Sequence, residues 1–164
     1  MKKILVAGLL LIMLFTFPIS ASAQTVSFEA QKIKIISETT EYFADGTSIT
    51  TTIWEESSTP LRAMNYTKTG NKSISGKDSS GNILFTFTVK GTFSVNAGVS
   101  ATCTATSYST SNLASGWSLK TASTYASSNQ AIGDATFEHK VLFIVTETRN
   151  CHVVLTCDVN GNLS

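Results

Sequence analysis

Charged side chains are scarce in this chain. Asp, Glu, Lys and Arg make up 14% of its 164 residues, and the formal net charge is +1. The basic residues form no stripe or cluster along the chain. Nucleic acids bind through many phosphate contacts to Lys and Arg, so nucleic acid is not expected as a partner.

Histidine is rarer still, because only His139 and His152 are present. Two ligands are too few for a protein zinc site, and the loop at residues 158–162 ends before the last carboxylate of a calcium loop. No Gly-x-Ser-x-Gly nucleophile elbow occurs. Glu55 and Glu56 are adjacent in an extended segment, so their side chains point to opposite faces. We therefore expect no metal, no cofactor and no catalytic residue.

Apolar residues with a helical period are missing beyond residue 23, whereas alternation with a period of two recurs. The odd positions from Ile83 to Val95 are apolar except for Gly91, where a bulge is expected. Thr and Ser fill most of the intervening positions, as in sheets with one face in water. About eight short strands separated by turn residues predict an all-β fold, an immunoglobulin-like or related antiparallel β-sandwich.

Residues 1–23 have the pattern of a secretory signal peptide that is cleaved after Ala23. The basic start Lys2-Lys3 precedes an apolar run, Ile4 to Phe17, which is shorter than the roughly 20 residues of a membrane-spanning helix. Cleavage leaves ten basic and eleven acidic side chains. The expected product is secreted into the extracellular space, with no membrane contact after cleavage.

The mature chain divides at a polar connector. Residues 24–60 contain N-terminal strands, a hairpin turn at Asp45-Gly46 and the connector, and residues 61–164 contain the body of the sandwich. We expect both segments to form one domain. Because Val141 to Val145 is strongly apolar, the strand at 136–145 is predicted to be buried on both faces, with the next turn at residues 147–150.

The three cysteines are Cys103, Cys151 and Cys157. An extracellular compartment permits disulfides. Cys151 and Cys157 are six positions apart in one predicted strand, which separates them by about 20 Å, so they are not expected to bond to each other. Cys103 is therefore expected to pair with one of them. The order Cys103, Trp117, Cys157 approximates the immunoglobulin pattern, but the tyrosine of that pattern is replaced by leucine at position 155.

Four short stretches carry a resemblance: Tyr66-Thr67-Lys68-Thr69-Gly70, Lys90-Gly91-Thr92-Phe93-Ser94, Ser100-Ala101-Thr102-Cys103-Thr104 and Leu155-Thr156-Cys157-Asp158. They are similar to segments of an uncharacterised family of small secreted β-rich proteins from Gram-positive anaerobic bacteria, over most of the mature chain. The resemblance implies secretion and β structure, and it supplies no catalytic residue. It matches the surroundings of Cys103 and Cys157, which implies a Cys103–Cys157 disulfide and leaves Cys151 as a free thiol.

Aromatic side chains are the remaining candidates for ligand binding. Trp54 breaks the alternation of Ile49 and Ile53 and is predicted to be exposed, so Trp54 and Tyr108 are candidate ligand-binding residues. We expect a secreted, non-enzymatic β-sandwich that binds a cell-wall, glycan or protein partner outside the cell. The alternative is a secreted effector or peptidase inhibitor acting through residues 107–116. A hydrolase is the least favoured hypothesis.

Overall fold

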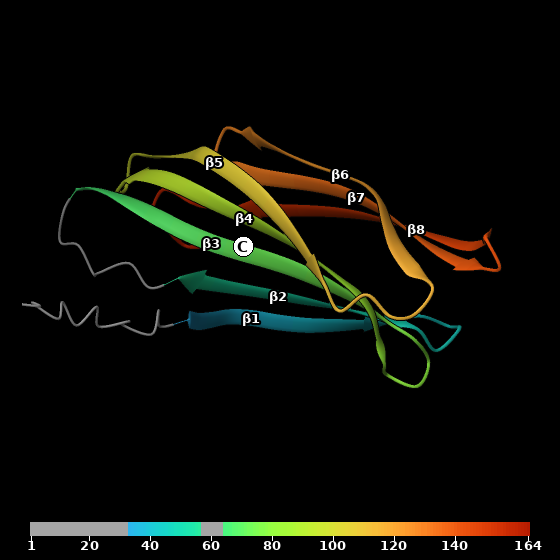
Figure 1. Ribbon diagram of the computed structural model, residues 1–164. Helices are drawn as coiled ribbons and strands as arrows, with labels where there is room; N and C mark the ends of the chain where they lie inside the picture. The colour runs from blue at the N-terminus through green and yellow to red at the C-terminus, as the bar shows by residue number, and fades with distance from the viewer. Residues whose placement is uncertain (1–32, 57–63) are drawn as a thin grey trace, which may run out of the picture. The chain divides into compact units, whose positions relative to one another are not determined.

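The computed structural model describes residues 33–56 and 64–164, which form two antiparallel sheets without a helix (Figure 1). The predicted signal peptide, residues 24–32 and residues 57–63 lie outside the described residues. The strands are β1 (Ile33–Tyr42), β2 (Ser48–Glu56), β3 (Asn65–Lys77), β4 (Ile83–Asn96), β5 (Ser100–Ser111), β6 (Trp117–Ser127), β7 (Gln130–Val141) and β8 (Ile144–Thr156).

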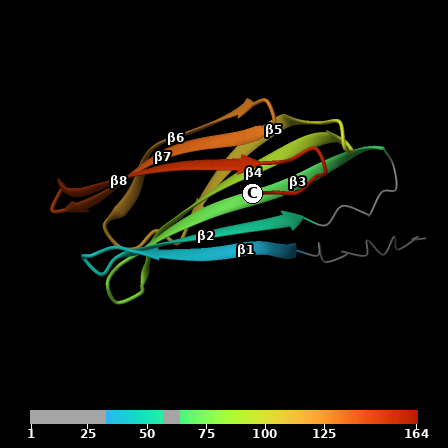
Figure 2. The same cartoon turned by 180° about the vertical axis from the view of Figure 1, so that it is seen from behind.

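Each sheet is a meander in which every strand pairs with the next one in the chain. Sheet A has the order β1-β2-β3-β4-β5 and sheet B the order β6-β7-β8. Sheet B packs on β3, β4 and β5, whereas β1 and β2 lie beyond its edge (Figures 1 and 2). The predicted β-sandwich is therefore confirmed, and β1 is exposed along its whole length.

Strands β4 and β7, one from each sheet, meet at the centre of the core. The ring centroids of Phe85 and Phe137 lie 4.4 Å apart in a stacked arrangement, and Phe87 meets Phe137 edge-on at 6.4 Å. The largest fully buried side chains are Phe87, Phe93, Phe137, Leu155, Val89, Val95, Val153 and Cys157. The odd-numbered residues from Phe85 to Val95 thus form the core face of β4, as the sequence predicts.

Two glycines allow the sheets to approach at this centre. A Cβ atom on Gly133 of β7 would collide with Val89 of β4, and one on Gly91 of β4 would lie 2.8 Å from Cβ of Ala131 on β7. The predicted bulge at Gly91 is wrong, because Gly91 pairs regularly with Gly70 and the register shifts between Thr92 and Phe93. Gly91 therefore serves close packing between sheets rather than a kink.

Two turns share one hydrogen-bond design. Asp78 accepts hydrogen bonds from the backbone N–H groups of Ser80 and Asn82 at 2.9 and 2.8 Å, and from the Asn82 side chain at 2.9 Å. Asp158 repeats this pattern with Asn160 and Asn162. These hydrogen bonds lower the pKa of both carboxyls. Local Asx-turns therefore account for the residues that resemble the start of a calcium loop.

The turn predicted at residues 147–150 is wrong, and so is the burial predicted for Val141 to Val145. The chain reverses at Leu142 and Phe143, and residues 147–150 belong to β8. Thr136 of β7 faces Asn150, whose Oδ1 accepts a hydrogen bond from the Thr136 hydroxyl at 3.0 Å. The polar segment is thus satisfied inside the sheet, and the apolar segment becomes an exposed hairpin tip in which Phe143 is 99% exposed.

Two phenylalanines of this hairpin test the account of the core. Phe137→Ala is expected to lower the free energy of unfolding by about 3–5 kcal/mol, because it leaves a cavity against Phe85 and Phe87. Phe143→Ala is the matched control, with an expected change within about 0.5 kcal/mol. Urea unfolding of the purified variants measures both, and a similar loss in the two variants would contradict the packing described.

Candidate functional site

The outer face of sheet B is a regular array of side chains in cross-strand rows. The row Thr121, Thr136, Asn150 lies beside the row Ser123, Asp134, His152, with one residue from each of β6, β7 and β8. Together these six polar side chains line a groove of about 370 Å³. The rows arise from register alone, because residues opposite each other in neighbouring strands share a face.

Asp134 and His152 form the closest contact in the groove. The Nδ1 atom of His152 lies 2.7 Å from Oδ1 of Asp134, and the two side chains are 62% and 50% exposed. The carboxylate fixes the orientation of the imidazole and offsets its charge when the ring is protonated. The groove therefore contains one acidic side chain and several hydrogen-bonding groups.

The dyad lacks the arrangement of a serine hydrolase. In a Ser-His-Asp triad the histidine stands between the other two residues, whereas here Asp134 stands between Ser123 and His152. Ser123 is two strands from His152, roughly 10 Å at the usual strand spacing. Within residues 33–56 and 64–164, no hydrogen bond joins a serine hydroxyl to a histidine ring.

The other histidine is held by the neighbouring strand. His139 Nδ1 lies 2.8 Å from the Thr146 hydroxyl, which itself donates to the backbone carbonyl of His139 at 3.2 Å. The Thr146 hydroxyl thus contacts both the ring and the backbone of His139. His139 also packs on Trp117, with ring centroids 5.5 Å apart. His139 pairs with Glu147 and His152 with Asp134, so the two histidines do not meet.

An apolar row borders the polar groove. Tyr125, Ile132 and Val154 are opposite each other on β6, β7 and β8, next to the row that contains Asp134. Tyr125 is 50% exposed, whereas Ile132 is buried beneath its neighbours. An exposed aromatic ring beside hydrogen-bonding side chains combines an apolar contact surface with polar groups that fix orientation.

The structure does not bring the two predicted ligand-binding residues together. Trp54 pairs with Asn71 in sheet A, on the face turned away from sheet B, and is partly exposed. Tyr108 pairs with Val89 on the core face, and its ring lies 5.9 Å from that of Phe87. Half of the predicted loop at 107–116 belongs to β5, which continues to Ser111.

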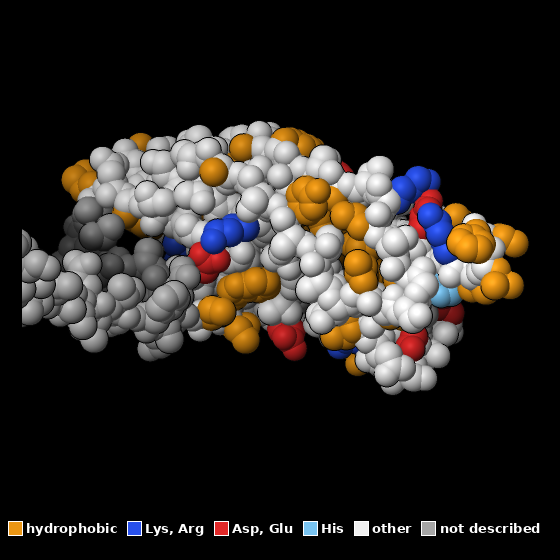
Figure 3. All heavy atoms as spheres, viewed as in Figure 1, with side chains coloured by type: hydrophobic (Ala, Val, Ile, Leu, Met, Phe, Trp, Pro, Cys, Tyr) orange, Lys and Arg blue, Asp and Glu red, His pale blue; other side chains and the backbone are white. Residues whose placement is uncertain are grey.

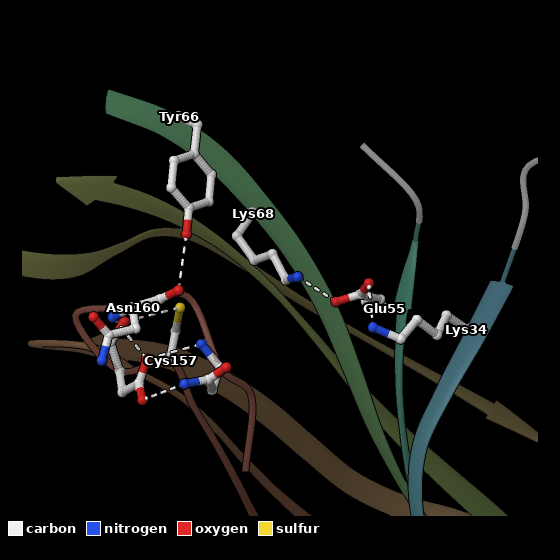
Figure 4. A network of polar contacts seen from close by, with 8 residues as sticks. Lys34, Glu55, Tyr66, Lys68, Cys157 and Asn160 are labelled. Atoms are coloured by element: carbon white, nitrogen blue, oxygen red, sulfur yellow. Dashed lines mark hydrogen bonds and ion pairs between the residues drawn. The ribbon is translucent and has the colours of Figure 1, made fainter. Parts of the chain in front are cut away.

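A second polar cluster lies where sheet A extends beyond sheet B (Figure 4). Lys68 donates a hydrogen bond to Glu55, and Lys34 lies 3.5 Å from the other carboxylate oxygen. These contacts, that of Lys68 first, lower the pKa of Glu55. Tyr66 donates to the carbonyl of Asn160 at 3.1 Å and so holds the C-terminal turn against β3. The two lysines share one carboxylate, and these contacts tie β1, β2 and β3 together.

The described residues contain no disulfide, and Cys103, Cys151 and Cys157 are free and buried. The expected Cys103–Cys157 bond is therefore absent from the structure. Each of these two thiols instead contacts a nearby backbone carbonyl, Cys103 that of Ala105 at 3.5 Å and Cys157 that of Asp158 at 3.6 Å. Cys151 lies opposite Ala135 at the core face of β8.

Comparison with known proteins identifies no relative. No family model matches the chain, and neither a curated protein nor a solved structure matches it. The resemblance to the secreted family from anaerobes therefore stays a prediction. In the described part of the chain, no group of three or more His, Cys, Asp or Glu side chains could hold a metal ion. Nor does that part include a helix long and apolar enough to cross a membrane.

Because the three thiols are buried, they are expected to react slowly with alkylating reagents. Burial raises the pKa of Cys151 and of Cys157 to about 11, so at a pH near 8 only about one molecule in a thousand carries either thiolate. We expect iodoacetamide to label the native chain at least about 100-fold more slowly than the chain in denaturant, with reactivity rising as the pH approaches these pKa values. Mass spectrometry counts the labels.

The same measurement tests the absence of a disulfide. The unfolded, unreduced chain is expected to accept three labels, one on each free cysteine. A single label before reduction would contradict the structure, as would rapid labelling of the folded chain.

Proposed function

We propose that this chain is a secreted, non-catalytic binding domain whose ligand site is the outer face of sheet B. The observation that supports the proposal is the polar groove beside the exposed ring of Tyr125. Its ligand is a neutral, hydroxyl-rich molecule, and a wall glycan is the class that fits. The sequence-based expectation of a glycan or protein partner is thereby narrowed to one class and one surface.

The chemistry of the groove favours such a ligand. Sugar rings present apolar C–H faces that stack on aromatic side chains, and their hydroxyls both donate and accept hydrogen bonds. Tyr125 supplies the ring, while Thr121, Ser123 and Asn150 supply groups that donate and accept. The acidic side chain of Asp134 in the groove disfavours anionic ligands.

The shape of the groove also fits a polymer. Its lining residues all come from three neighbouring strands of one sheet, so it is a shallow surface feature without an enclosing loop. A shallow site of this kind contacts one face of a ligand and leaves both ends free to continue. Successive rows along the strands can therefore contact successive units of a chain-like ligand.

The alternatives receive less support. An effector or peptidase inhibitor acting through residues 107–116 needs a projecting loop, but residues 107–111 are paired with β4. A hydrolase needs a nucleophile and a base in contact, and Ser123 and His152 are on opposite sides of Asp134. No specific observation in the described residues supports either activity.

Tyrosine variants test the proposal. Purified chain is expected to bind isolated cell walls or glycans on an array, and Tyr125→Ala is expected to weaken binding by at least about tenfold through loss of ring stacking. Tyr42→Ala is the matched control, because Tyr42 is a strand residue, 77% exposed, outside the groove. His152→Ala should weaken binding as well, whereas Trp54→Ala should not.

Sedimentation with isolated walls and affinity on the array give the measurement. Absence of any retention by the unaltered chain would refute glycan binding. Equal losses in the Tyr42 and Tyr125 variants, or dependence on Trp54 in place of Tyr125, would place the site on another surface.

A further inference from the structure

We propose that the tip of the β7–β8 hairpin, residues 141–145, inserts into the surface of a lipid bilayer. This inference is independent of the glycan site, which lies on the outer face of sheet B. It also departs from the sequence-based expectation of no membrane contact after signal cleavage.

The tip is a continuous apolar segment in contact with solvent. The exposed fractions are 49% for Val141, 85% for Leu142, 99% for Phe143, 68% for Ile144 and 44% for Val145. In the space-filling view a hydrophobic cluster lies at the end of the molecule where Figure 1 shows this hairpin (Figure 3). Soluble proteins seldom leave such a cluster in water unless it contacts a partner.

The backbone of the turn is unfavourable for the residues it contains. Leu142 and Phe143 have φ angles of 49° and 71°, in the left-handed region. Two-residue hairpin turns of this kind favour Asn-Gly, because Asn and Gly tolerate the left-handed region and larger apolar side chains are strained there. Leucine and phenylalanine therefore do not serve the stability of the turn, and strain of this kind is characteristic of functional sites.

A bilayer fits this tip better than a protein surface does. Ile144 and Val145 are consecutive in β8, so they point to opposite faces of the ribbon, and both are exposed. An apolar medium on all sides satisfies both faces, whereas a flat protein surface contacts only one. The pairs Val141–Ile144 and Lys140–Val145 continue the strand ladder to the turn, so the inserted strand backbone is largely hydrogen-bonded.

The size of the tip and the charges behind it agree with interfacial insertion. The tip extends two residues on the β7 side of the chain reversal and three on the β8 side, which corresponds to roughly 7–10 Å, the depth at which interfacial segments lie. Behind the tip, Lys120 and Lys140 share the carboxylate of Glu138 at 2.6 and 3.3 Å, and Arg149 pairs with Glu147 at 2.5 Å. Arg149 also interacts with the carboxyl of Asp45, so the charges balance as a group, but the side chains of Lys120 and Lys140 are 56% and 46% exposed and can contact anionic lipid headgroups.

A turn replacement separates membrane binding from folding. The double variant Leu142→Asn with Phe143→Gly installs the residues that the turn geometry favours, so its urea midpoint should equal or exceed that of the parent chain. Its binding to vesicles of phosphatidylcholine and phosphatidylglycerol should fall by at least about tenfold, because the inserted side chains are gone. Val99→Ser is the control, since Val99 is 68% exposed in the β4–β5 turn.

Vesicle flotation with the full purified chain and light scattering without lipid decide the outcome. Binding of the parent and Val99→Ser chains, with loss in the turn variant, is the expected result. Absence of binding by the parent chain, or equal binding by the turn variant, would overturn the proposal. Self-association of the parent chain that the turn variant abolishes would overturn it too, because the tip would then be covered by a second copy.

Discussion

The close approach of β4 and β7 is the constraint on which the rest of the structure depends. Val89 of β4 occupies the space where Gly133 of β7 lacks a side chain. In the same way, Ala131 of β7 packs where Gly91 of β4 lacks one. This complementarity places the Phe85–Phe137 stack at the centre of the core. It also sets the parity of sheet B, because Gly133 must face inward, and so Asp134 must face solvent.

The inward-facing residues therefore determine the outward-facing site. Once Gly133 and Ala135 face β4, the intervening positions of β7 face outward, and pairing with β6 and β8 completes the polar rows. The same register carries β7 and β8 past the edge of the core until the chain reverses at Leu142 and Phe143. The groove and the apolar tip are thus consequences of one packing arrangement, although they suit ligands of opposite polarity.

The sequence alone predicts the all-β sandwich and the core face of β4, because alternation with a period of two is a local signal. It does not predict the Asp134–His152 contact, which joins two residues through strand register alone. The prediction that Val141 to Val145 are buried is wrong for a clear reason. Hydrophobicity predicts burial only on average, whereas here β7 and β8 stay paired as far as Val141 and Ile144, so the chain reverses at Leu142 and Phe143. The Cys103–Cys157 disulfide implied by resemblance is not formed in the structure, although the two buried thiols are near enough to affect each other electrostatically, and the pairing stays a prediction.

Native-state hydrogen exchange tests the central claim most directly. If the contact between β4 and β7 holds the sandwich together, their central amides should exchange only through global unfolding, with protection equal to the free energy of unfolding from urea denaturation. Amides of β1, which lies beyond sheet B, should exchange through smaller openings. Equal protection of β1 and β4, or exchange of the β7 amides near Gly133 by local opening, would contradict the account.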